Sequence, residues 1–211
     1  MGDLFITEED LYSNLDLSGS SPFDLIYDLR LSNDRIFYID FEIDTSIYRI
    51  QKQIININLE DFKKGIPANK RKPIKLLIDC VGGNLDETMS LVATIKQSVT
   101  PVWTINIANA FSGGALILLS GSKRFALPYS KAMIHTGYNE ITGTYEQIIE
   151  QVNKYKKEII EMKGFILSNT TISGKLYNKM KSKDWYMTCK EQVYYGLVDE
   201  IVENLYSLLE E

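Results

Sequence analysis

Apolar residues along this chain recur at two different spacings, and the alternation between them predicts a sheet covered by helices. Short runs of β-branched and aromatic residues predict strands; these lie at residues 35–39, 74–79, 102–107, 124–127 and 131–135. Apolar positions at helical spacing predict helices; these lie at residues 23–31, 44–64, 85–96, 113–120 and 144–168. Because several of these helices fall between consecutive strands, we expect crossover connections and an α/β fold with a mainly parallel sheet.

The beginning of the chain has a different character. Residues 8–10 are all acidic, and residues 18–22 combine serine, glycine and proline, which favour turns. We therefore expect residues 1–22 to form an acidic segment outside the core and residues 23–211 to form one domain. A length of 211 residues with 45% apolar residues suits a single domain with a sizeable core.

Charge and hydropathy exclude several classes of function. The formal net charge is −5, and contacts to phosphates require a basic face, so we do not expect nucleic acid as a partner. A basic run at residues 63–75 fits a solvated loop between a helix and a strand; a patch that faces a partner is the alternative. The longest apolar run, residues 115–119, is far shorter than the roughly 20 residues of a membrane-spanning helix.

Cysteine content and the chain start add to this picture. Cys80 and Cys189 show no metal-ligand spacing and no disulfide scaffold, and we interpret both as buried small apolar residues and not as nucleophiles. The first residues carry acids where a signal peptide has bases. The sequence thus predicts a soluble, cytoplasmic protein with no metal, no organic cofactor and no membrane partner.

The chain contains one histidine, His135, which lies 23 positions after Ser112. Histidine is the side chain best suited to acid–base chemistry near neutral pH. Ser112 follows a predicted strand and opens a predicted helix, with Gly113 and Gly114 behind it. Small neighbours leave a hydroxyl accessible, and the N–H groups of a helix start stabilise an oxyanion, so Ser112 is a candidate nucleophile. An ordinary helix start is the alternative, because small residues are common there.

A second loop, Val81-Gly82-Gly83, follows another predicted strand. A diglycine there directs N–H groups into a cleft; a tight turn between strand and helix is the alternative. A base such as His135 also needs an acid to orient it, and Glu140 and Asp184 are the candidates. Both give the chain order serine, histidine, acid, which differs from the order serine, acid, histidine of α/β-hydrolases.

Six separate segments, in matching order and spacing, resemble the proteolytic subunit of the Clp protease, a family of serine peptidases with a crotonase-like fold. They are Phe23-Asp24-Leu25-Ile26-Tyr27 with Asp34-Arg35-Ile36-Phe37; Val81-Gly82-Gly83-Asn84; Ala110-Phe111-Ser112-Gly113-Gly114-Ala115; Lys123-Arg124-Phe125-Ala126-Leu127-Pro128-Tyr129-Ser130 with Met133-Ile134-His135; Asp184-Trp185-Tyr186-Met187-Thr188; and Tyr195-Gly196-Leu197-Val198-Asp199. The resemblance covers residues 23–201. It implies repeated β-β-α units, a mainly parallel sheet and a protruding handle helix within about residues 136–170.

Carried over residue by residue, the resemblance implies that Ser112 is the nucleophile, His135 its base and Asp184 the acid that orients the imidazole. Gly83 and Gly113 match the backbone N–H donors of the oxyanion hole. The implied function is a serine endopeptidase that hydrolyses unfolded proteins and peptides inside a ring-shaped chamber. The implied partners are further copies of the chain, in stacked rings, and an AAA+ unfoldase that feeds unfolded polypeptide into the chamber.

The sequence departs from the family pattern beside this implied site. Cys80-Val81 replaces the usual Ser-Pro, so the turn before the diglycine loses the rigidity of proline. Gly113 replaces a bulkier residue, which predicts a more mobile backbone and a wider pocket, and Thr136-Gly137 replaces Gln-Pro after the histidine. These departures motivate one alternative, a noncatalytic ring or scaffold subunit. A phage-type maturation protease with the same serine is a variant of the peptidase. A crotonase-type acyl-CoA enzyme is a further alternative, because that fold shares paired oxyanion amides.

Overall fold

The computed structural model describes residues 30–210. The chain divides into two compact units, residues 1–34 and 35–211, and each is described by itself. In the first unit, residues 30–33 are helical, in agreement with the end of the helix predicted at residues 23–31. The rest of that helix and the predicted acidic segment 1–22 lie outside the described residues.

Within the described residues, the second unit is built on a seven-stranded sheet. Its strands are β1 (Ile36–Ile39), β2 (Ile74–Cys80), β3 (Val102–Phe111), β4 (Lys123–Ala126), β5 (Lys131–Ile134), β6 (Trp185–Thr188) and β7 (Glu200–Ile201). The order is β1-β2-β3-β4-β7, and β5 branches off to pair with both β3 and β6. The β5–β6 pair is antiparallel and the other pairs are parallel, which confirms the predicted mainly parallel α/β fold.

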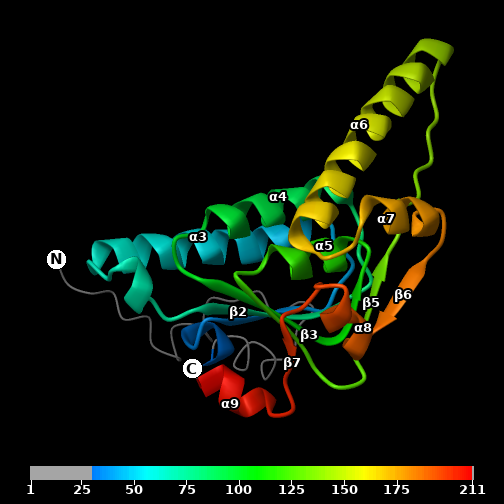
Figure 1. Ribbon diagram of the computed structural model, residues 1–211. Coiled ribbons are helices and arrows are strands. Elements are labelled where there is room, and N and C mark those ends of the chain that lie inside the picture. Colours follow the sequence, from blue (N-terminus) through cyan, green and yellow to red (C-terminus); the bar gives the residue numbers. More distant parts are fainter. Residues whose placement is uncertain (1–29, 211) are drawn as a thin grey trace, which may run out of the picture. The chain divides into compact units, whose positions relative to one another are not determined.

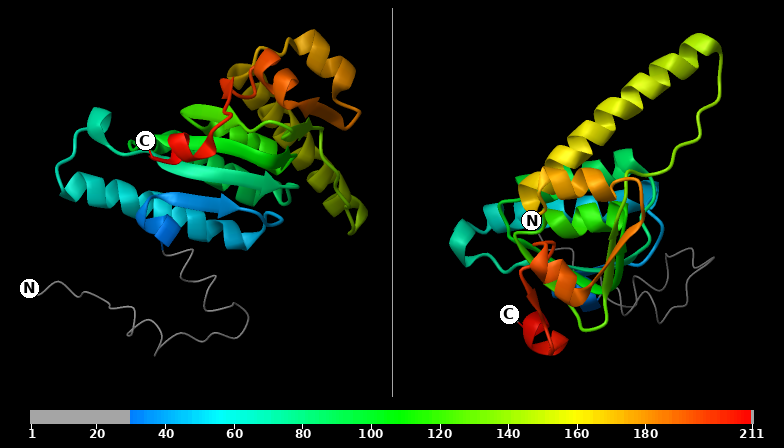
Figure 2. Two further views of the ribbon diagram at one scale, coloured as in Figure 1. Left: turned by 90° about the horizontal axis from the view of Figure 1, so that it is seen from below. Right: turned by 45° about the vertical axis from the view of Figure 1, so that its right-hand side comes forward.

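Helices cover this sheet. They are α3 (Tyr48–Lys63), α4 (Leu85–Gln97), α5 (Gly113–Ser120), α6 (Tyr145–Asn169), α7 (Gly174–Met180), α8 (Cys189–Tyr194) and α9 (Leu205–Glu210), with short 3₁₀ turns η1 (Thr45–Ile47) and η2 (Ala68–Lys70). Figure 1 shows α3, α4 and α5 above β2 and β3, and α9 on the opposite side. The left view of Figure 2 looks onto that opposite side, where the ammonium of Lys75 on β2 donates to the carbonyl of Leu209 on α9 (2.6 Å).

The helix α5 lies at the centre of the core. All of its residues are buried, and it carries no polar face because it packs between β2, β3 and α4. At its second residue, Gly114, a Cβ atom would lie only 2.9 Å from the carbonyl oxygen of Cys80. Glycine at this position therefore lets the start of α5 approach the end of β2, and this contact brings the two candidate loops together.

A buried ionic cluster anchors the start of β1 to α3. The guanidinium of Arg35 contacts both carboxylate oxygens of Asp61 (2.6 and 2.9 Å), and the Thr100 hydroxyl donates to the same carboxylate (2.8 Å). Burial alone raises the pKa of Asp61, but the hydrogen bonds from Arg35 and Thr100 outweigh it and hold that pKa below its usual value. The carboxylate thus stays charged and fully paired in the core.

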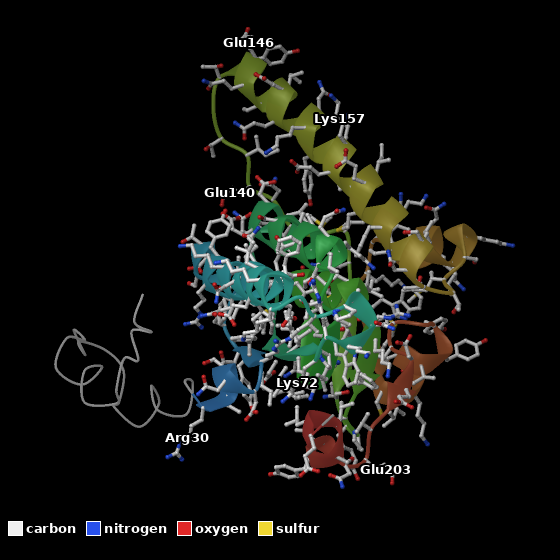
Figure 3. All side chains as sticks on the ribbon, turned by 90° about the vertical axis from the view of Figure 1, so that its left-hand side faces the viewer. Arg30, Lys72, Glu140, Glu146, Lys157 and Glu203 are labelled. Atoms are coloured by element: carbon white, nitrogen blue, oxygen red, sulfur yellow. The ribbon has the colours of Figure 1, made fainter. Side chains whose placement is uncertain are left out.

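The helix α6 projects beyond the sheet. Its first turn is closed by a capping box of Thr144 and Gln147, and only Met162 and Ile166, near its other end, are buried. Figure 3 shows Glu146 and Lys157 on the part that projects. None of the helices in the described residues is both long and apolar enough to cross a membrane.

From residue 30 to residue 169, the predicted elements agree with the structure, with shifts at their ends. The helix predicted at 44–64 begins with the 3₁₀ turn η1, which Asp44 caps by accepting from the Ser46 N–H. The strand β3 extends to Phe111, four residues beyond the prediction, and β5 ends at Ile134 rather than at residue 135. The elements after α6 were not predicted.

Candidate active site

Ser112 stands at the junction of β3 and α5 in a backbone conformation that is rare for a residue with a side chain. Its φ is +53° and its ψ is −117°. Such a conformation costs about 1–3 kcal/mol, and it persists only where the surroundings enforce it. Here the Ser112 N–H donates to the Met133 carbonyl (2.8 Å), and the carbonyl of Ser112 accepts from the N–H of Ala115 (3.0 Å). The strand and the helix together therefore hold the hydroxyl in one place.

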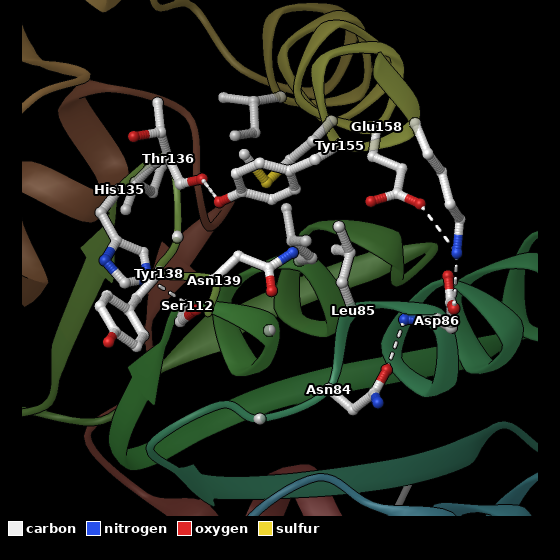
Figure 4. Close-up of a pocket in the computed structure, with 18 residues that line it drawn as sticks. Asn84, Leu85, Asp86, Ser112, His135, Thr136, Tyr138, Asn139, Tyr155 and Glu158 are labelled. Carbon is white, nitrogen blue, oxygen red and sulfur yellow. Dashed lines mark hydrogen bonds and ion pairs between the residues drawn. The ribbon is translucent and has the colours of Figure 1, made fainter. Parts of the chain in front are cut away.

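Strand register brings Ser112 to His135. The strands β3 and β5 run parallel with Phe111 opposite Met133, so the residues that follow them meet at the same edge of the sheet. The Nε2 atom of His135 lies 2.8 Å from the Ser112 Oγ, a hydrogen-bonded distance. Figure 4 shows this contact at one end of a cleft.

Antiparallel register brings Asp184 to the other side of the imidazole. Ile134, the last residue of β5, is paired with Trp185, the first residue of β6. His135, which follows β5, therefore faces Asp184, which precedes β6. The Nδ1 atom of His135 lies 3.2 Å from the Asp184 carboxylate. Of the two acids considered from the sequence, the structure places Asp184 against His135, while Glu140 makes no such contact among the described residues.

The diglycine loop lies against Ser112 and is fixed by Ile43. The Ile43 N–H donates to the Gly82 carbonyl (2.7 Å), and the Asn84 N–H donates to the Ile43 carbonyl (2.8 Å). A Cβ atom at Gly82 would lie 2.7 Å from the Ser112 Cβ, and one at Gly83 would overlap the Ile43 backbone. Both glycines have positive φ, at +104° and +147°. Only glycine fits at either position.

Gly83 and Gly113 line the same cleft as Ser112, and their backbone N–H groups have no acceptor in the described part of the chain. Gly113 is the first residue of α5, where an N–H has no partner within the helix. Within residues 30–210, the N–H of Gly83 has no hydrogen-bond acceptor either. The structure thus brings together all five residues predicted for the site: Ser112, His135, Asp184, Gly83 and Gly113.

Cys80 fixes the turn that lacks proline. Its Sγ accepts from the Gly82 N–H (3.3 Å) and donates to the Phe41 carbonyl (3.1 Å). Burial raises the pKa of this thiol, so it remains a protonated donor. The prediction that Cys80 is buried is confirmed, whereas the same prediction for Cys189 is wrong, since Cys189 is only partly buried. The hydrogen bonds of Cys80 hold the loop, as the ring of a proline would.

Gly113 does not widen the pocket on the side where a side chain would lie. A Cβ atom at this position would lie 2.6 Å from the Thr88 hydroxyl and 3.0 Å from the Ile43 Cδ1. Thr88 and Ile43 therefore fill the space of the bulkier residue expected there. Thr88 is itself fixed, because its hydroxyl donates to the Asn84 carbonyl (2.6 Å).

A cleft of about 430 Å³ extends from the Ser112–His135 pair towards α6 (Figure 4). Part of its lining is apolar: Leu85, Leu116, Ile134, Met162 and Ile166. Its far end is charged, because Lys154 on α6 pairs with Glu158 (3.3 Å) and with Asp86 (3.5 Å). The cleft suits a substrate side chain that is mostly apolar.

Known proteins resemble this chain in sequence over the elements that carry the site. A family model described as Clp protease matches residues 21–205. This chain belongs to the Clp protease family. The match spans all six segments on which the resemblance rests, and the reaction class follows with it: the chain is a serine peptidase of the Clp type. The alternative of an acyl-CoA enzyme is thereby set aside.

Curated relatives resemble this Clp protease chain over most of its length. One is the ATP-dependent Clp protease proteolytic subunit 2 of Corynebacterium diphtheriae, 28% identical over 190 residues that cover 89% of this chain and 91% of the relative. Another is the ATP-dependent Clp protease proteolytic subunit 3 of Synechococcus sp. (strain CC9902), 29% identical over 182 residues, with 83% and 86% covered. A third, subunit 2 of Prochlorococcus marinus (strain MIT 9312), is 28% identical over 180 residues, with 82% and 83% covered.

Sequence reasoning missed three residues that shape this Clp protease site: Ile43, Thr88 and Tyr155. Ile43 forms an isolated β-bridge with Gly83 that belongs to none of the strands. No spacing pattern in the sequence indicates such a bridge. Thr88 gave a usable signal, since it is a polar residue on the apolar face of a predicted helix. Tyr155 fits the apolar spacing of the helix predicted at residues 144–168, and that spacing does not indicate that its hydroxyl donates to the Thr136 carbonyl (3.0 Å).

Proposed function

We propose that Ser112 is the nucleophile of a peptidase, that His135 is its base, and that Asp184 orients the imidazole. The observation that carries this proposal is the continuous chain of contacts from Asp184 through His135 to the Ser112 hydroxyl. The same three roles recur on unrelated folds in different chain orders. The N–H groups of Gly83 and Gly113, two residues that line the same cleft as Ser112, are proposed as the oxyanion hole.

In the first half of the reaction, the Ser112 Oγ attacks the carbonyl carbon of the scissile peptide bond. His135 Nε2 takes the hydroxyl proton, and the Asp184 carboxylate stabilises the imidazolium that forms. The carbonyl oxygen becomes an oxyanion, to which Gly83 and Gly113 donate. His135 then gives its proton to the leaving amine, and the acyl group remains bound to Ser112.

In the second half, water replaces the amine. His135 Nε2 takes a proton from the water as its oxygen attacks the acyl carbon, and a second oxyanion forms in the same hole. The intermediate collapses, the proton returns to the Ser112 Oγ, and the new carboxyl end of the peptide leaves. No cofactor enters this sequence of steps.

The proposed substrate is unfolded polypeptide or short peptide. An extended chain places its side chains into the cleft one at a time, and the apolar lining favours an apolar side chain next to the cleaved bond. The charged pairs of Lys154 at the far end limit how far such a side chain extends.

The proposed assembly is a pair of stacked rings that encloses these sites in the cytoplasm. Residues 136–170 form the proposed handle through which the rings stack, because Tyr145, Ile149 and Ile160 expose 74%, 45% and 68% of their surface on α6. Exposed apolar side chains of this size mark a surface that a partner covers. The names of the relatives, ATP-dependent Clp protease proteolytic subunits, support an AAA+ ATPase as the partner that feeds substrate.

The proposed function is tested with the wild-type protein. We expect it to hydrolyse a short fluorogenic peptide and to react with a fluorophosphonate, and peptide mapping should locate the adduct on Ser112. Native mass spectrometry of the same sample should give an assembly of about a dozen or more subunits. Rings that neither react with the fluorophosphonate nor hydrolyse peptide would identify a noncatalytic scaffold subunit. A monomer that is labelled on Ser112 would contradict the proposed stacked rings but not the proposed nucleophile.

The oxyanion hole gives a second prediction. Replacing Gly83 by alanine forces a Cβ atom into the Ile43 backbone at a φ of +147°, so the loop must move and its N–H no longer reaches the oxyanion. Loss of one such donor lowers kcat by about 10²- to 10³-fold. Steady-state kinetics on a fluorogenic peptide measures this effect.

Gly65→Ala is the matched control for Gly83→Ala. Gly65 also has positive φ, at +66°, but no atom lies within 4 Å of its would-be Cβ. The control also places a side chain at a positive φ, but without a clash and at a residue that does not line the cleft, so its kcat should equal that of the wild type. Equal losses in both variants would show that strain, and not the position of the Gly83 N–H, lowers the rate.

A further inference from the structure

His135 lies where the strand that carries it ends. Its predecessor, Ile134, is the last paired residue of β5, opposite Trp185. After His135 the chain forms no helix or strand until Tyr145. Strand pairing thus fixes the backbone on one side of the histidine only, and the other side needs a different support.

That support comes from Tyr155 on α6. Its hydroxyl donates to the Thr136 carbonyl at 3.0 Å, as Figure 4 shows. In the described chain, this is the one hydrogen bond that ties residues 136–143 to another element. Gly137 has a φ of +84°, and a Cβ atom there would lie 3.1 Å from the Tyr155 hydroxyl, so glycine leaves room for the contact.

The hydroxyl of Tyr155 is suited to this role. The side chain is half-buried against the cleft, where burial, followed by the nearby charge of Glu158, raises the pKa of the phenol. It therefore stays protonated and donates one directed hydrogen bond. Thr136 directly follows His135 in the chain. The hydrogen bond from Tyr155 to the Thr136 carbonyl therefore limits rotation of the backbone next to His135.

We propose that Tyr155 is a positioning residue that holds His135 between Ser112 and Asp184 through the Thr136 carbonyl. This inference rests on the proposed function, since it assigns Tyr155 a task only if His135 is the base. Tyr155 takes the place of the rigidity that Gln-Pro would supply after the histidine and that Thr136-Gly137 lacks.

The test is Tyr155→Phe, which removes the hydroxyl and keeps the ring that lines the cleft. We expect kcat to fall about tenfold, as for loss of one ordering hydrogen bond, with KM changed by less than about twofold. A ring that served only to bind substrate would leave kcat unchanged. An unchanged kcat with an active wild-type enzyme would therefore overturn this inference and leave the proposed function intact.

A spectroscopic readout does not depend on turnover. Because the chain has one histidine, ¹⁵N-histidine labelling followed by solid-state NMR of the assembled protein reports His135 alone. The wild type should show a single tautomer, protonated at Nδ1, whereas Tyr155→Phe should show a mixture or broadened signals. Identical spectra of the two proteins would overturn the inference even if the activities differed.

Tyr177→Phe is the matched control. Tyr177 is buried, and the ammonium of Lys163 on α6 lies 5.7 Å from the centre of its ring. Its hydroxyl has no hydrogen-bond partner within the described residues, so its removal affects burial but not the segment after His135. We expect wild-type kcat and an unchanged His135 spectrum for this variant, and equal effects in both variants would point to a general loss of packing.

Discussion

Replacing Ser112 by alanine should lower peptide hydrolysis by about 10⁶-fold, which leaves only the weak acceleration due to the oxyanion hole and substrate binding. The hydroxyl is the group that forms the acyl intermediate, and Cys80 does not substitute for it, since its thiol is buried and donates to the Phe41 carbonyl. Labelling by a fluorophosphonate should also disappear. Steady-state kinetics and intact mass spectrometry measure both losses.

The Ser112→Ala variant should fold and assemble normally. Alanine and serine share the same backbone preferences, so the strained φ of +53° is supported equally in both. The Ser112 hydroxyl contacts His135, which is partly exposed and can bind water instead. Native mass should be unchanged, and the variant Ser168→Ala, at an exposed serine of α6, should keep full activity.

The double variant Ser112→Ala with His135→Ala tests whether the two residues act together as one catalytic unit or contribute to the rate independently. Residues that act as one unit lose no more together than either loses alone. We therefore expect the double variant to match Ser112→Ala within experimental error. A further large loss on removal of His135 would contradict the role of His135 as the base of Ser112.

The sequence predicts the strands and helices up to α6 because most of them bury one face, which leaves a spacing pattern, and because β2 and α5 are buried almost throughout, which leaves a continuous apolar run. The helices that follow α6 are too short for a helical spacing pattern, since α7 has 7 residues and α8 has 6. One local signal was present. Thr188 and Glu191 form a capping box at the start of α8, and that motif is readable from the sequence alone.

The sequence indicates which residues are candidates for the site, but it does not show how they are arranged in space. Scarcity identified His135 and small neighbours identified Ser112, but only strand register decides that they meet, through the pairing of β3 with β5. The choice of Asp184 over Glu140 came from the resemblance, and in the structure it depends on the antiparallel pairing of Ile134 with Trp185. Contacts such as Thr88 against Gly113 depend on how a helix packs, and a single sequence does not encode that in any local pattern.

Replacing Asp184 by asparagine should lower kcat by about 10⁴-fold with little change in stability. A carboxylate accepts the proton on His135 Nδ1 and leaves Nε2 free to take the Ser112 proton. An asparagine amide can instead donate to Nδ1, which favours the tautomer with the proton on Nε2, and that imidazole cannot act as a base. The Asp184 side chain is 58% exposed, so replacing it by a neutral residue leaves no buried charge without a partner. The thermal unfolding temperature should therefore match that of the wild type.

Glu140→Gln is the matched control, because Glu140 was the other acid considered and the structure leaves it exposed and away from His135. It should retain wild-type kcat. In ¹⁵N-histidine spectra, Asp184→Asn should move the proton from Nδ1 to Nε2, while Glu140→Gln should leave it in place. A large loss in Glu140→Gln together with an active Asp184→Asn would reverse the assignment, since the acid would then be supplied by the segment after His135 and not by the strand beside it.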